Sequence, residues 1–103
     1  MHFEVRRMIG PDHPSLPGHF AGAPIVPGVV ILDEILAALT EWRQNSRVTV
    51  INAVKFLVPL KPDQPFTICL AANDHAEGQV DFRCYIENRM IVEGRLQVRY
   101  CSN

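Results

Sequence analysis

The residues of this sequence whose types and spacing suit chemistry are His19, Gly28 and Asp33. His19 lies between a glycine and a phenylalanine, in a loop rich in proline and glycine that leads toward an apolar helix. Gly28 falls where that helix is expected to begin, and backbone N–H groups there have no helical acceptor. A histidine base beside such donors is the layout needed to remove a proton next to a thioester carbonyl, because the donors stabilise the enolate-like charge that develops.

Asp33 adds a carboxylate to this layout. On a helical wheel it lies near Val29, Leu36 and Thr40, at the border of the apolar side, where a carboxylate would be partly desolvated and able to act as an acid. Glu34 lies on the polar side and is expected to face water. The alternative is that Asp33 is an ordinary acid that the helix dipole favours in the first turns.

The motifs of several other functional classes are absent from the sequence. The segment GHFAG is neither a dinucleotide-binding loop nor a Walker loop, and there is no HExxH or GxSxG motif. The four histidines lack metal-ligand spacing, so no metal is expected: His2, His13, His19 and His75. A simpler interpretation of the loop stays open, in which it only caps a buried helix and His19 is an ordinary loop residue.

The elements that must position these residues can be predicted from periodicity and turn residues. The segment 10–28 holds five of the eight prolines and four of the six glycines, so it is neither regular helix nor central strand. A heavily buried helix is expected from Pro27, in its first turn, to about Asn45, with Val29 on the buried side and Arg43 in the last turn. Strands are expected at 2–9, 47–60, 65–73, 79–88 and 90–101. The order predicts an α+β fold, with one helix against an antiparallel sheet.

The bulk properties limit the functional classes. The 103 residues fit one domain, over 1–103, and a domain of this size gains from pairing with a second copy. A net charge of −1 gives no argument for nucleic acid or for an anionic membrane, and no apolar run is long enough for a span. The amino terminus lacks the apolar stretch of a secretory signal. Three widely spaced cysteines predict reduced thiols and a cytoplasmic location.

Two blocks of the sequence resemble one family. PGHFAGAPIVPGVVILDEI resembles the signature G-H-F-P-x-x-P-x-x-P-G-V of the hotdog-fold 3-hydroxyacyl-acyl-carrier-protein dehydratases, and VKFLVPLKPDQPFTI resembles the later segment K-F-x-x-P-V-x-P-G-D. His19 comes early in the chain, and in this respect the sequence resembles compact dehydratase-like proteins of accessory lipid or aryl-polyene pathways. Asp63 stands where the family tends to have glycine.

The resemblance implies a fold and a reaction. The fold would be a hotdog, in which an antiparallel sheet wraps around one long central helix. His19 would take the C2 proton of a 3-hydroxyacyl thioester, Asp33 would help expel the C3 hydroxyl as water, and the N–H of Gly28 would polarise the carbonyl. The product would be a trans-2-enoyl thioester. Each site would combine the histidine of one subunit with the acid of the other, which implies at least a homodimer.

The same resemblance suggests partners and a substrate site. Four residues are expected to line an acyl tunnel: Phe20, Ile25, Val29 and Leu36. The substrate is expected on acyl-carrier protein or coenzyme A, without a cofactor, and an acidic carrier would meet basic side chains, of which the sequence offers Arg6, Arg7, Arg47, Lys55 and Arg89. Two alternatives stay open, a hotdog thioesterase and a non-catalytic acyl-binding subunit.

Overall fold

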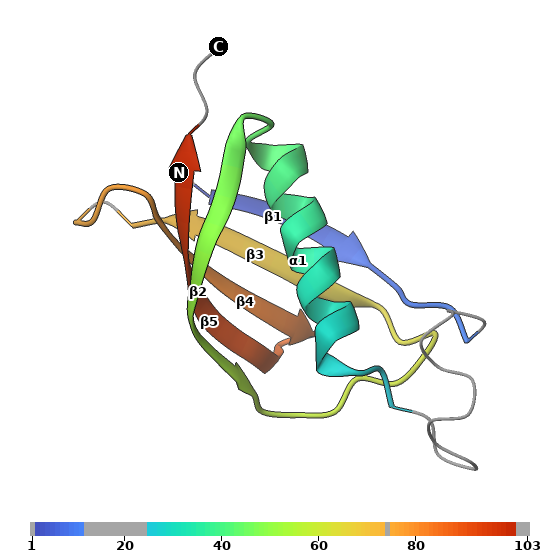
Figure 1. Ribbon diagram of the computed structural model, residues 1–103. Helices are drawn as coiled ribbons and strands as arrows, with labels where there is room; N and C mark the ends of the chain where they lie inside the picture. The colour runs from blue at the N-terminus through green and yellow to red at the C-terminus, as the bar shows by residue number, and fades with distance from the viewer. Residues whose placement is uncertain (1, 12–24, 74, 101–103) are drawn as a thin grey trace.

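The computed structural model describes residues 2–11, 25–73 and 75–100, and in these it forms one helix and five strands. The elements in chain order are β1 (His2–Arg7), α1 (Gly28–Trp42), β2 (Ser46–Phe56), β3 (Phe66–Ala72), β4 (Gln79–Ile86) and β5 (Arg89–Tyr100). Figure 1 shows α1 lying across one face of a strongly twisted sheet. The expected α+β class and the order of elements are confirmed.

The sheet is antiparallel throughout, with the strand order β1-β3-β4-β5-β2. The two edges are therefore β1 and β2, and β2 reaches the edge because it pairs only with β5 in the described sheet. Two register irregularities interrupt that pairing, between Val48 and Val50 and between Ile51 and Ala53. Irregularities of this kind bend a strand and increase its twist.

The core lies between α1 and the sheet. In β4 the buried residues Val80, Phe82 and Cys84 alternate with more exposed ones, as the period-2 pattern of the sequence predicts. The helix contributes Ile31, Ile35 and their buried neighbours. The largest fully buried side chains come from every layer: Phe66, Phe82, Ile35, Leu39, Leu60, Ile68, Leu70, Ile91 and Leu96.

The buried side of α1 is narrower than the sequence pattern indicates. Val30, Ile31, Ile35, Ala38 and Leu39 are buried, whereas Val29 is 63% exposed. The expectation of a buried Val29 is therefore wrong for the single chain. One sheet covers only one side of a helix, so part of a wide apolar arc is left outside it.

A cluster of aromatic side chains fixes the carboxyl-terminal end of α1. Trp42 stacks on Phe3 of β1 with ring centroids 6.2 Å apart. The guanidinium of Arg43 lies 4.2 Å from the centroid of Trp42 and 5.6 Å from that of Tyr100 in β5. The sequence places Arg43 in the last helical turn, but it is the C-cap residue, because the helix ends at Trp42 and the Arg43 N–H donates to the Leu39 carbonyl at 2.7 Å. The cation–π contacts of Arg43 join α1 to β5, and the stacking of Trp42 on Phe3 adds β1.

Some expected boundaries also differ. The first strand ends at Arg7. The strand β2 ends at Phe56, so the segment 57–60, which contains Pro59, lies outside it. Pro27 is the N-cap of α1 rather than a first-turn residue. Within the described residues, no helix is both long and apolar enough to cross a membrane.

Candidate functional site

The amino terminus of α1 presents backbone donors. Pro27 caps the helix in an extended conformation without a side-chain cap, and its carbonyl accepts the N–H of Val30 at 3.0 Å and of Ile31 at 3.4 Å. The N–H groups of Gly28 and Val29 find no backbone acceptor among the described residues. Amides in the first turn are left without helical partners and carry the positive end of the helix dipole. This end of α1 therefore suits a carbonyl oxygen that gains negative charge.

An apolar hollow of about 340 Å³ adjoins this helix end. Its walls are the segment before and within the first turn of α1 and the segment that follows β2, and they comprise Ile25, Val26, Gly28, Ile31 and the run 56–60. The two walls are joined by a hydrogen bond from the Val26 N–H to the Leu60 carbonyl, 2.8 Å long. The second wall is tied to β5 in turn, since the Leu57 N–H donates to the Ile91 carbonyl at 2.7 Å. These hydrogen bonds therefore fix the shape of the hollow, and its walls are apolar.

Phe56 lies directly against Gly28 within this hollow. A Cβ added to Gly28 would fall 2.7 Å from Cζ of the Phe56 ring and 3.0 Å from its Cε2. Cβ atoms are essentially never found within 3.0 Å of another atom, so a side chain at position 28 would have to displace the ring of Phe56. The missing side chain allows both the ring and a ligand to approach the backbone closely.

Asp33 lies on another side of α1. It is five residues beyond Gly28, which places it about 140° farther around the helix, and it does not line the hollow. Its side chain is exposed in the single chain. Asp33 and the Gly28 amide of one chain therefore do not face the same space.

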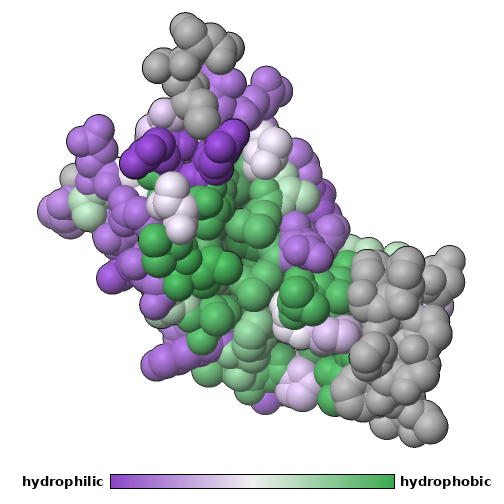
Figure 2. Space-filling model, in the orientation of Figure 1, coloured by the Kyte–Doolittle hydropathy of each residue, from purple (hydrophilic) through white to green (hydrophobic). Residues whose placement is uncertain are grey.

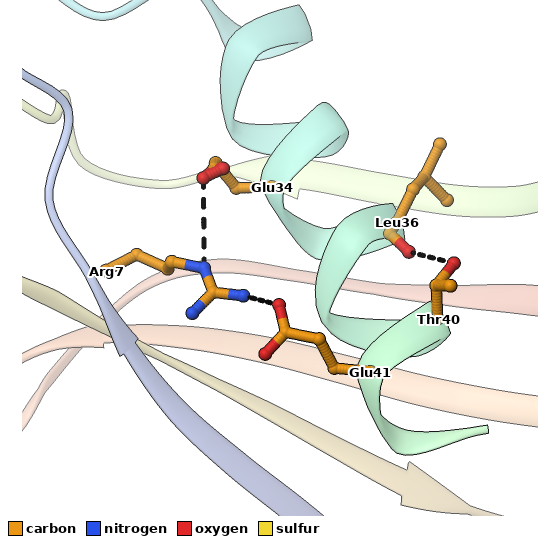
Figure 3. A network of polar contacts seen from close by, with 5 residues as sticks. All are labelled: Arg7, Glu34, Leu36, Thr40 and Glu41. Atoms are coloured by element: carbon orange, nitrogen blue, oxygen red, sulfur yellow. Dashed lines mark hydrogen bonds and ion pairs between the residues drawn. The ribbon is translucent and has the colours of Figure 1, made fainter. Parts of the chain in front are cut away.

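Glu34, in contrast, has a partner. Figure 3 shows the guanidinium of Arg7, at the end of β1, between Glu34 and Glu41 of α1. The Arg7 Nε lies 3.8 Å from the Glu34 Oε1, and the Arg7 Nη2 also donates to the Glu41 carboxylate. The expectation that Glu34 simply faces water is wrong, because the side chain of Arg7 covers it. Of the two neighbouring acids, Asp33 is the one that no ion pair occupies among the described residues.

Exposed apolar side chains gather along the free edge of the sheet. Val50, Ile51, Phe56 and Leu57 are each exposed by between 42% and 48%, and together they form what we call the β2 apolar edge. Figure 2 shows apolar surface in the middle of this face, over the region between α1 and β2. A long edge strand with apolar side chains is a ready template for pairing with another chain.

The structure brings together only some of the residues expected from the sequence. Ile25 and Gly28 line the hollow, whereas Val29 is exposed and Leu36 is half-buried beside the core. His19 and Phe20 lie outside the described residues. Sequence reasoning did not assign Phe56 to the site, although the K-F of the second family block was a signal for it.

The described cysteines are poor candidates for a reactive thiol. Burial raises the pKa of Cys84 to about 12, and the nearby thiol of Cys69 acts in the same direction. Burial, together with a hydrogen bond and a coulombic interaction with Glu4, raises the pKa of Cys69 to about 11. The Cys69 Sγ donates to the Glu4 Oε1 at 3.3 Å. Thiols with such values are protonated near neutral pH and react slowly.

The chain is similar in sequence to proteins named as 3-hydroxyacyl-[acyl-carrier-protein] dehydratases. The chain is 27% identical over 97 residues to the 3-hydroxyacyl-[acyl-carrier-protein] dehydratase FabZ of Chlamydia trachomatis serovar D, covering 82% of this chain and 63% of that protein. It is 27% identical over 97 residues to FabZ of Syntrophotalea carbinolica, covering 84% of this chain and 66% of that protein. The chain thus spans less than two thirds of the length of these relatives.

Solved structures confirm the hotdog fold. An uncharacterized protein of Erwinia carotovora superposes with a TM-score of 0.83 at 24% identity, over 96% of this chain and 83% of that one. The dehydratase heterocomplex ApeI:P of Xenorhabdus doucetiae gives a TM-score of 0.82 at 19% identity, over 94% and 86%. The fluoroacetyl-CoA thioesterase FlK has the same fold, with a TM-score of 0.71 at 13% identity, over 97% and 86%.

The family of the chain follows from a match that covers most of its length. The family model for ApeI-like proteins, described as ApeI dehydratase, matches residues 1–95, which is nearly the whole chain. The chain therefore belongs to the ApeI-like dehydratase family.

Proposed function

We propose that this protein dehydrates 3-hydroxyacyl thioesters to trans-2-enoyl thioesters. His19 accepts the proton from C2, the electrons of that C–H bond form the C2–C3 double bond, and the C3 hydroxyl leaves as water with a proton from Asp33. The Gly28 N–H binds the carbonyl oxygen, on which negative charge develops. The single-domain assignment over 1–103 and the roles of these residues are part of this proposal.

The observation that carries the proposal is the Gly28 amide at the edge of an apolar hollow. The hollow offers an acyl chain an apolar surface, and the first-turn amides offer the thioester oxygen hydrogen-bond donors. Donors fixed in a helix need no reorganisation when charge develops, which is the source of their catalytic effect.

A second copy of the chain completes the site in this proposal. Asp33 does not line the hollow of its own chain, so in this proposal the acid beside each Gly28 comes from a partner. Pairing along the β2 apolar edge would cover exposed apolar side chains and satisfy the free backbone groups of the edge strand. We therefore propose a homodimer. The ApeI:P structure is described as a heterocomplex, so a different chain in the place of the second copy is the competing outcome.

The thioester is proposed to arrive on acyl-carrier protein, in the cytoplasm. FabZ relatives are named for carrier-bound substrates, and a cytoplasmic location agrees with the free thiols of Cys69 and Cys84. An acidic carrier requires exposed cations, and four of the basic residues suggested by the sequence are exposed: Arg6, Arg47, Lys55 and Arg89. Arg7 is a weaker candidate because its guanidinium is already paired with Glu34 and Glu41.

The test is a direct assay with 3-hydroxyacyl and saturated acyl thioesters. Formation of the conjugated enoyl thioester, followed by its absorbance, is expected from the hydroxy compound. His19→Ala and Asp33→Asn are expected to lower turnover by about 10²–10⁴-fold while the dimer persists. Glu34→Gln is the matched control, because Glu34 is bound to Arg7 on another side of the helix, and it should retain turnover within a few-fold. Thiol release from the saturated compound without enoyl formation would instead make the protein a thioesterase.

A further inference from the structure

Among the residues that the structure describes, the ring of Phe56 is the group that lies nearest to where a side chain of Gly28 would be, and the N–H of Gly28 is the proposed carbonyl-binding amide. The tip of the Phe56 ring points at Gly28, so closely that no Cβ fits between them. The ring also lines the hollow and is 47% exposed in the single chain, so the rest of that chain does not enclose it. Any group bound at the Gly28 N–H from the side of the hollow therefore lies beside the Phe56 ring.

The chemistry of a thioester determines which of its atoms lies beside the Phe56 ring when the carbonyl oxygen is bound at the Gly28 N–H. The carbonyl carbon carries the sulfur on one side and C2 on the other. The sulfur leads to a carrier arm with amide groups, which are costly to bury without partners and so extend toward water. The acyl side is apolar and enters the hollow. C2, directly bonded to the carbonyl carbon, then faces the ring of Phe56.

We infer that Phe56 is a specificity-determining residue that excludes thioesters with an alkyl branch at C2. This inference rests on the proposed function. The ring leaves no room beside Gly28, so a methyl group on C2 would have to displace either the ring or the carbonyl oxygen from the amide. The linear substrate carries only hydrogen in that direction and is accommodated.

A branched substrate remains chemically competent, so its exclusion would be steric. A 2-methyl-3-hydroxyacyl thioester keeps one C2 hydrogen. Removal of that proton and loss of the C3 hydroxyl as water would give a 2-methyl-2-enoyl thioester, with no other reactant consumed. A failure to turn over therefore reports on the shape of the site.

The experiment compares the N-acetylcysteamine thioesters of 3-hydroxybutyrate and of 2-methyl-3-hydroxybutyrate, the latter in both configurations at C2. We expect the wild-type kcat/KM to be at least about 10-fold higher for the linear substrate. This is the lower end of the discrimination that a pocket achieves between substrates that differ by one carbon. Phe56→Ala should reduce that ratio by about 10-fold, mainly through faster turnover of the branched substrate. Phe56→Leu, which keeps an apolar side chain at the end of β2, should give an intermediate ratio.

Leu57→Ala is the matched control. Leu57 lines the same hollow and is 48% exposed, but it is not among the nearest neighbours of Gly28. Because Leu57 belongs to the hollow proposed to hold the acyl chain, Leu57→Ala is expected to affect both substrates alike, and the ratio of their kcat/KM values should stay unchanged. An equal gain in Leu57→Ala, or a wild-type enzyme that accepts both substrates alike, would overturn the role of Phe56 while the dehydratase function stands. Absence of enoyl product from the linear substrate would instead refute the proposed function. Circular dichroism verifies folding, and Phe56→Leu decides the question if Phe56→Ala is unfolded.

Discussion

The ring of Phe82 in β4 lies over Gly94 of β5, its partner in the ladder. A Cβ on Gly94 would be 2.3 Å from Cζ of that ring and 2.3 Å from the Ala53 carbonyl oxygen of β2. Phe82 is fully buried, so its ring is held in place by the surrounding core. The glycine thus allows three strands to pack closely around one large core side chain.

Gly94→Ala should consequently destabilise the fold. Inserting a methyl group where one neighbour is backbone and the other a buried ring forces displacement, at a cost of about 1–3 kcal/mol in the free energy of unfolding. Urea denaturation measures the loss. Adding Phe82→Leu to Gly94→Ala should cost less than the sum of the two single changes, because the smaller side chain makes room. Strict additivity would show that the ring and the methyl group do not compete.

Glu87→Gly should stabilise the β4–β5 hairpin. Glu87 begins the two-residue turn with a φ of 54°, a left-handed conformation that costs a residue with a side chain about 1–2 kcal/mol. Glycine removes this strain but adds freedom to the unfolded chain, so a net gain of up to about 1 kcal/mol is expected in thermal unfolding. Asn88→Gly is the control, because Asn88 has no positive φ and should gain nothing.

Arg7→Met should loosen the attachment of α1 to β1. The substitution leaves Glu34 and Glu41 without their common cation, and a loss of about 1 kcal/mol is expected because the network is only partly exposed. The effect should shrink at high salt. Arg95→Met provides the comparison, since Arg95 lies 3.0 Å from Asp81 but is 52% exposed, and its loss should be smaller. Equal losses would mean that the Arg7 network does not hold the helix.

Ile51→Glu should separate the proposed dimer. A charge in the middle of the β2 apolar edge would be buried without a partner in the paired state, but it is solvated in the single chain. Sedimentation equilibrium should show the wild type as a dimer and the variant shifted toward the monomer. Met8→Glu places the same charge on an exposed residue beyond β1, at the opposite edge, and should remain dimeric. A monomeric wild type would contradict pairing of identical chains.

Thiol labelling should be slow in the native protein. With the pKa raised from about 9.0 to about 11, the thiolate fraction of Cys69 at pH 8 falls about a hundredfold, and Cys84 has a still higher value of about 12. In a Cys101→Ser background, iodoacetamide should modify Cys69 at a rate reduced by about that factor relative to the denatured chain. The rate should rise with pH up to about 11. Rapid labelling at pH 8 would show that Glu4 and burial do not protect the thiol.

The sequence predicted the sheet and the helix well because their patterns are local. The alternation around Phe82 placed β4 correctly, and the proline and glycine of Pro27-Gly28 marked the start of α1 to within a residue. The exposed Val29 was missed because helical periodicity gives the width of an apolar arc but not how much of it one sheet can cover. Asp63, where the family tends to have glycine, has a φ of 64°, which explains that preference in physical terms.

The candidate site was predictable only in part. The amide at Gly28 followed from the helix start, whereas the close approach of the Phe56 ring to Gly28 joins residues 28 positions apart. Such a contact depends on how the segment after β2 returns to the helix, held by hydrogen bonds between backbone groups that carry no sequence signal. In the same way, the helical wheel singled out Asp33 over Glu34, but the ion pair between Glu34 and Arg7 joins two elements and could not be derived from the wheel.

The packing of Trp42 has a practical consequence for spectroscopy. It is the only tryptophan of this sequence, and it is stacked on Phe3 and covered by Arg43 at the end of α1 remote from Gly28. Its fluorescence will therefore follow the detachment of β1 and of the last helical turn, and it will be nearly silent to events at the other end of the helix. Ligand titrations will need an added chromophore near the hollow, whereas unfolding can be followed without any label.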